Sequence, residues 1–195
     1  MDLGSVVAQA AEVLSKPNQG FWKSQVQSPA KDDFQDSFVL PFVIGCGILI
    51  CLPYLRYGIV PALMMGLLSG GFLWGLPYAM TWFSDSVATG MEGVGYRRET
   101  LHLWALVQVP LALGLVLGAI TEPFVSMQVL AMGGLGYTIY LGTLFLPELH
   151  RVPGAKRTGF LVAIGVGLTV AFFVERVFLE EVIRAMLMSR FQNAL

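Results

Sequence analysis

The stretch FVLPFVIGCGILICLPYL, residues 38–55, decides the fold class of this chain. It contains eighteen residues and no charged side chain, and Arg56 follows it directly. At about 1.5 Å per residue, a helix of this length crosses nearly all of a hydrocarbon core about 30 Å thick. The sequence therefore predicts a transmembrane helix here.

Four more apolar runs follow the first, and each is bounded by charged residues, polar residues or proline. They span residues 59–83, 101–120, 125–146 and 160–178. We therefore predict an all-α integral membrane bundle of five transmembrane helices, preceded by a short amphipathic N-terminal helix. Pro61, Pro77 and Pro110 are positions at which these helices can kink.

We expect three parts: residues 1–37, a cytoplasmic interfacial segment; residues 38–178, the five-helix domain; and residues 179–195, a helical extension on the outer side. No secretory signal peptide is recognised.

The composition agrees with a membrane protein. The 195 residues are 55% hydrophobic and 13% charged, against about 25% charged in an ordinary soluble domain. The net charge of −1 provides no basic surface for nucleic acid. Cys46 and Cys51 are interpreted as small apolar residues of one helix, because their spacing suits neither a disulfide framework nor a metal site.

Basic residues predict the orientation of the chain, because lysine and arginine gather on the cytoplasmic side of a membrane. The side shared with the N-terminus carries Lys16, Lys23, Lys31, Arg97, Arg98, Arg151, Lys156 and Arg157, whereas the other side carries Arg56, Arg184 and Arg190. We predict a bacterial inner-membrane protein with a cytoplasmic N-terminus and a periplasmic C-terminus.

Residues 3–14 have helical apolar spacing and end before Lys16 and Pro17. This stripe either lies on the membrane surface or packs on the protein's own helices. Phe21 and Trp22 follow as candidate membrane-surface or partner contacts. Ser28 and Pro29 predict the start of a helix that runs into the first span.

Glycines four residues apart recur within the apolar runs, and this spacing lets helix backbones approach closely. The pairs are Gly66 and Gly70, Gly71 and Gly75, and Gly114 and Gly118. We expect packing within the bundle. Contact with a second copy or with another membrane protein is the alternative.

Titratable groups are scarce in the spans. Glu175 and Arg176 are adjacent, so we expect them to point to different faces and to need separate partners. They lie either in the outer headgroup zone or at a polar contact or buried ion site. His102 and His150 are interpreted as interfacial rather than as haem or metal ligands, and no catalytic motif is found.

We expect no catalytic residue, metal or cofactor, although a bound lipid is compatible with the composition. The candidate partner contacts on the basic side are His150, Arg151, Lys156 and Arg157.

The order of several short motifs resembles bacterial members of the Yip family, which are Ypt/Rab-interacting membrane proteins. The motifs are LSKP at residues 14–17, GFW at 20–22, FVLPF at 38–42, YRR at 96–98, VPL at 109–111, YTIY at 137–140, LPELHRVP at 146–153 and AKR at 155–157.

The resemblance covers about residues 3–170 and implies five spans with a cytoplasmic N-terminus. Eukaryotic relatives act in vesicle trafficking and bind small GTPases through longer N-terminal segments. The segment here is about 37 residues and lacks their aspartate-leucine-tyrosine-glycine-proline motif, which argues against GTPase binding.

The sequence is compatible with three functions. The first is a non-enzymatic Yip-like protein that organises the membrane or partner proteins. The second is an accessory subunit of a larger membrane complex. The third is a small transporter or channel, which the scarcity of charge in the spans disfavours.

Overall fold

The computed structural model of this chain describes residues 3–15, 34–121 and 127–192. Within these ranges the chain is helical and has no strand, which confirms the all-α prediction. In the described part of the chain, five helices are long and apolar enough to cross a membrane: Asp36–Tyr57, Ile59–Gly90, Arg98–Thr121, Gln128–Leu149 and Gly154–Leu179. The five predicted spans are therefore confirmed, with ends that differ by a few residues.

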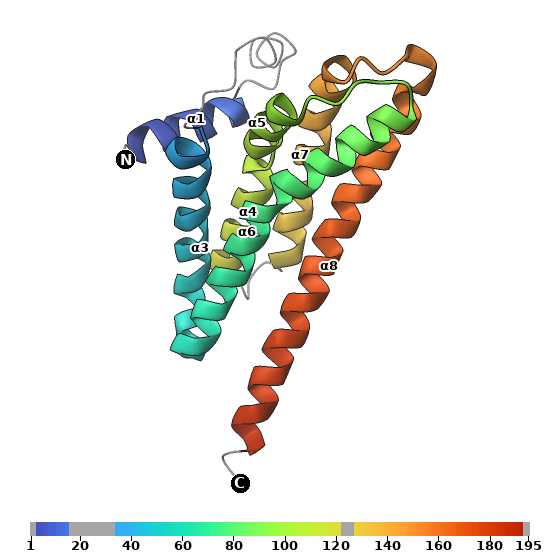
Figure 1. The fold of residues 1–195 in the computed structure, drawn as a ribbon. Coiled ribbons are helices and arrows are strands. Elements are labelled where there is room, and N and C mark those ends of the chain that lie inside the picture. Colours follow the sequence, from blue (N-terminus) through green and yellow to red (C-terminus); the bar gives the residue numbers. More distant parts are fainter. Residues whose placement is uncertain (1–2, 16–33, 122–126, 193–195) are drawn as a thin grey trace.

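The first span begins with a π-helical turn, Gln35–Val39, and continues as α3, Leu40–Tyr54. A 3₁₀ turn, Leu55–Tyr57, leads to α4, Ile59–Gly90. Gly58 joins this turn to α4 with a φ of 112°, a backbone conformation that residues other than glycine rarely adopt. At about 1.5 Å per residue, the 32 residues of α4 exceed the membrane core, and the helix crosses the bundle obliquely beside α8 (Figure 1).

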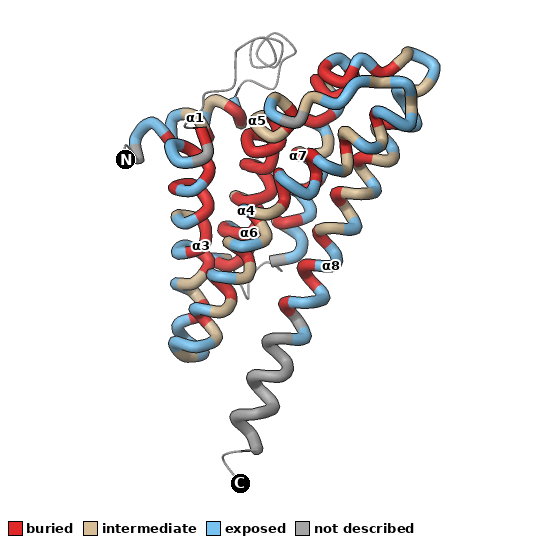
Figure 2. Tube along the Cα trace, in the orientation of Figure 1, coloured by how far each residue is buried: buried red, intermediate tan, exposed pale blue. Residues whose placement is uncertain are grey.

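The third span contains two helices, α5, Arg97–Val107, and α6, Val109–Thr121, rather than the single helix predicted. The break falls at Gln108, two residues before Pro110. Proline has no N–H to donate to the carbonyl four residues earlier, so the helical ladder is interrupted there. This span forms the centre of the bundle, since Trp104, Leu111 and Leu115 are almost completely buried (Figure 2).

The fourth span is α7, Met127–Leu149, which packs most extensively on α6. A 3₁₀ turn, Gly154–Lys156, then leads to α8, Arg157–Gln192. This single helix continues well beyond the other helices at the end of the bundle opposite α1 (Figure 1). The fifth helix therefore continues without interruption beyond the predicted span, residues 160–178.

The N-terminal helix α1, Leu3–Ser15, lies across the end of the bundle that also carries residues 91–96 and 150–156 (Figure 1). We call this the loop end. Val6, Ala10 and Val13 are buried against the bundle, and the Tyr137 hydroxyl donates to the Leu14 carbonyl at 3.3 Å. Part of the apolar stripe therefore packs on the protein's own helices, whereas Val7 is 68% exposed.

Candidate functional site

Two connections at the loop end are joined by reciprocal hydrogen bonds. The Val94 N–H donates to the His150 carbonyl at 2.8 Å, and His150 Nδ1 lies 2.9 Å from the Val94 carbonyl. A Cβ at Gly93 would lie 2.7 Å from the His150 carbonyl, so this approach requires glycine. The connection between α4 and α5 is thereby fixed to the connection between α7 and α8.

Asp85, in the last turns of α4, lies beside this junction. The Thr100 hydroxyl donates to Asp85 Oδ1 at 3.3 Å, and His150 Nδ1 is 3.7 Å from the same oxygen. The side chain of Asp85 is 12% exposed, whereas that of His150 is fully buried. We call Asp85, Thr100 and His150 the Asp85 cluster; it brings together α4, α5 and the end of α7.

His150 carries no positive charge at neutral pH. Burial lowers its pKa from the ordinary value of 6.5, while the hydrogen bond to Val94 and the attraction of Asp85 act in the opposite direction with smaller effect. Since a carbonyl can only accept, Nδ1 carries the hydrogen and donates it to Val94. His150 therefore does not neutralise Asp85.

We expect acidification from pH 7.5 to 5.5 to lower the thermal stability of the purified protein. The unfolded histidine takes up a proton near pH 6.5, whereas the folded one does so only at lower pH, so stability falls as pH decreases through this range. The contribution is at most about 1.4 kcal/mol per pH unit, or a few degrees in Tm. Thermal unfolding of wild type and His150→Gln at both pH values measures it; equal acid shifts in the two proteins would contradict it.

The predicted basic contact residues also lie at the loop end. Lys156 Nζ is 2.7 Å from Glu92 Oε1, the Arg157 Nε donates to the Val152 carbonyl at 3.2 Å, and the Arg151 guanidinium lies 5.9 Å from the centre of the Tyr96 ring. The structure thus brings Arg151, Lys156 and Arg157 to the same end as the Asp85 cluster. Phe21, Trp22, Ser28 and Pro29 lie outside the described residues.

Glu175 and Arg176 form a buried ion pair with each other. The arginine donates to both carboxylate oxygens, from Nε at 2.6 Å and from Nη2 at 2.8 Å, and each residue is 8% exposed. The expectation that they point to different faces and need separate partners is wrong, because their side chains converge. The arginine also lies 5.7 Å from the centre of the Phe172 ring.

The predicted glycines divide into packed and open positions. A Cβ at Gly66 would lie 2.7 Å from the Gly47 carbonyl oxygen, and one at Gly114 would lie 2.5 Å from that of Leu130. Gly118 is buried in α6, and Gly70 has only ordinary contacts with α3. Gly71 and Gly75 differ, since a Cβ at either would meet nothing within 4 Å.

Comparison with known proteins identifies the family. A family model described as the Yip1 domain matches residues 11–174. The chain belongs to the Yip1 family. The resemblance found in the sequence is thereby confirmed, and the match ends one residue before Glu175. No curated protein and no solved structure matches the chain.

Within this Yip1 domain, sequence analysis missed two kinds of residue. Asp85 follows the second apolar run by two residues and belongs to no recognised motif, and Gly47 has no glycine four residues away. A usable signal for the Asp85 cluster exists: Asp85, Thr100 and His150 all stand at span ends predicted to share one side of the membrane. For Gly47, only the packing of α3 on α4 reveals the close approach.

Proposed function

We propose that this Yip1-family protein is a non-enzymatic multi-pass membrane protein that organises partner membrane proteins through a groove between α3 and α4. The groove has a volume of about 480 Å³. Its lining includes four glycines, Gly47, Gly66, Gly70 and Gly71. Large apolar side chains, among them Ile44, Ile48, Leu63, Leu67 and Trp74, complete it. We call it the α3–α4 groove.

The observation that supports docking of a partner helix is the open position of Gly71. A glycine within a helix costs about 1 kcal/mol relative to alanine, and the fold has no neighbour that requires one there. Leu67 and Trp74, one turn away on either side, are 70% and 49% exposed. A helix of another chain could approach α4 closely at Gly71, as small residues permit in membranes.

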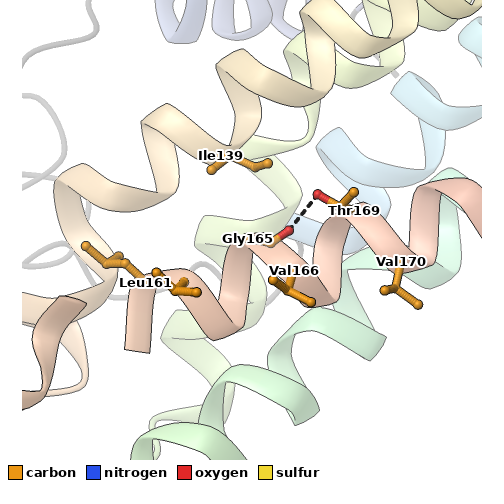
Figure 3. Close-up of a pocket in the computed structure, with 7 residues that line it drawn as sticks. Ile139, Leu161, Gly165, Val166, Thr169 and Val170 are labelled. Carbon is orange, nitrogen blue, oxygen red and sulfur yellow. Dashed lines mark hydrogen bonds between the residues drawn. The ribbon is translucent and has the colours of Figure 1, made fainter. Parts of the chain in front are cut away.

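A second shallow groove, of about 460 Å³, lies between α7 and α8 and includes Ile139, Leu161 and Val166 (Figure 3). The Thr169 hydroxyl donates to the Gly165 carbonyl at 2.7 Å, so its hydrogen is used within the helix (Figure 3). This surface is apolar, and we propose that membrane lipid covers it.

The proposed setting is a bacterial inner membrane with the loop end in the cytoplasm. Phe21 and Trp22 would then add partner or membrane-surface contacts on that side. The α3–α4 groove equally suits an accessory subunit of a larger membrane complex, which is the second candidate. The experiment below separates the two by the stoichiometry of the proteins that co-purify.

We expect Gly71→Leu to reduce the amount of co-purifying protein about tenfold when the chain is isolated from native membranes in mild detergent. Leucine would occupy the space through which the partner helix approaches α4. A loss of about 1.4 kcal/mol in binding free energy weakens binding tenfold. The matched control is Gly133→Leu on α7, another glycine with open space around it. A fixed set of proteins in constant ratio would favour the accessory subunit. A wild-type protein that elutes alone would overturn both candidates.

A further inference from the structure

A polar hollow opens beside Asp85 at the loop end. It has a volume of about 630 Å³ and is lined by Trp82, Asp85, Ser86, Thr89, Gly90 and Gly95. All of these except Asp85 are exposed, and Trp82 is 66% exposed. We call this hollow the Asp85 pocket. Because it is built from the last two turns of α4 and the following connection, it opens on the outside of the bundle where the second span ends.

The side-chain oxygens around the pocket are available to accept hydrogen bonds. The Ser86 hydroxyl donates to the Trp82 carbonyl at 2.8 Å, and the Thr89 hydroxyl donates to the Asp85 carbonyl at 2.7 Å. Their hydrogens are therefore used within α4, while their lone pairs remain available. A ligand with N–H donors fits this arrangement better than one with acceptors.

The negative charge of Asp85 is weakly compensated. Its hydrogen bond from Thr100 is long, at 3.3 Å, and the nearby His150 is neutral at pH 7. Among the described side chains, no lysine or arginine lies within 4.0 Å of its carboxylate. A carboxylate that is 12% exposed in such surroundings gains from a cation supplied by a ligand.

Two further features favour a cation. The carboxyl end of α4, with Thr89 and Gly90, borders the pocket, and the partial negative charge at the end of a helix attracts positive groups. The indole of Trp82, also in the lining, can attract a cation through its ring face.

The position of the pocket relative to the membrane indicates which ligand can reach it. The apolar part of the second span ends at Phe83, so we infer that Asp85, Ser86 and Thr89 lie near the level of lipid headgroups. We propose that the Asp85 pocket binds the primary ammonium group of an ethanolamine phospholipid from the leaflet at the loop end. A choline headgroup has no N–H to donate to the carboxylate and hydroxyls, so the pocket distinguishes the two lipids.

The test uses the full-length protein in detergent micelles, titrated with phosphatidylethanolamine, its mono- and dimethyl derivatives, or phosphatidylcholine of the same acyl chains. Bound lipid is counted by native mass spectrometry. We expect affinity to fall with each added methyl and to be about tenfold lower for choline, the factor typical of a charge-assisted hydrogen bond. Asp85→Asn should abolish this preference.

The matched control is Glu92→Gln, which removes an exposed carboxylate at the same end that is paired with Lys156 and lies outside the pocket lining. This variant should keep the preference. If Asp85→Asn does not fold, Trp82→Leu at the exposed rim provides the second test and should reduce the preference.

Equal binding of both lipids by the wild type, or a preference that survives Asp85→Asn and Trp82→Leu, would overturn the proposal. If a lysine-containing peptide binds the pocket and the wild type shows no lipid preference, the proposal is likewise overturned in favour of a protein ligand. The proposal is independent of the α3–α4 groove, since Asp85→Asn should leave co-purifying proteins unchanged.

Discussion

Gly114→Ala is expected to destabilise the bundle by about 1–3 kcal/mol, the usual cost of overpacking a close contact. The new methyl would lie 2.5 Å from the Leu130 carbonyl oxygen and 3.2 Å from the Ala131 Cα. Both are backbone atoms of α7, so the contact can be relieved only if α6 and α7 move apart. This is the most extensive helix pair in the described part of the chain.

Thermal unfolding in a fixed detergent measures this effect, with Gly133→Ala as the matched control. Gly133 lies in α7 and faces open space, so its replacement should preserve stability or raise it through the better helix propensity of alanine. An unchanged melting temperature for Gly114→Ala would show that α6 and α7 do not approach as closely as described.

Arg176→Ala is expected to have the largest effect on stability, a loss of about 3–5 kcal/mol, because it leaves the buried carboxylate of Glu175 without its partner. The Ser69 hydroxyl of α4 is fully buried and lies near Glu175, but a single neutral donor cannot replace the charge of the arginine. Glu175→Gln should cost less, because the amide oxygen can still accept a hydrogen bond from the guanidinium, although Arg176 loses its counter-charge.

The double variant Glu175→Leu/Arg176→Leu distinguishes a structural pair from a functional one. Replacing both members of a buried ion pair with apolar residues is often neutral or stabilising, so this variant should recover most of the stability.

Ion flux into liposomes should be the same for wild type and Glu175→Gln. A flux that depends on Glu175 would favour the transporter alternative over an organising role.

The five spans could be predicted from the sequence because they depend on local properties, namely apolar runs of the length that crosses a membrane. The apolar face of α1 was equally visible, since Val6, Ala10 and Val13 share one side of a helix. What covers that face could not be read locally, because a membrane surface and the bundle itself both bury apolar side chains.

Features that depend on packing between helices could not be derived in this way. Gly66 and Gly71 each begin a pair of glycines four residues apart, yet only Gly66 meets a neighbouring backbone, because the rotation of the helix decides which glycines face inward. The pairing of Glu175 with Arg176 depends on side-chain rotamers rather than on helical spacing. The Asp85 cluster joins three helices, and sequence reasoning could supply only the shared side of the membrane.

The break in the third span could be predicted from the sequence only in part. Pro110 marks a point where a helix can bend, and this was visible in the sequence. That the missing N–H of Pro110 ends α5 at Val107 and begins α6 at Val109, instead of only bending one helix, could not be read from the sequence.

Site-specific photocrosslinking in native membranes shows whether the α3–α4 groove contacts another membrane protein. A photoreactive residue at Leu67, which lines the groove and is 70% exposed, is compared with one at Val129 on α7, which is 61% exposed and outside the groove. We predict a discrete protein adduct from position 67 that is absent from position 129. Lipid adducts alone from both positions would show that the groove contacts lipid and no partner protein.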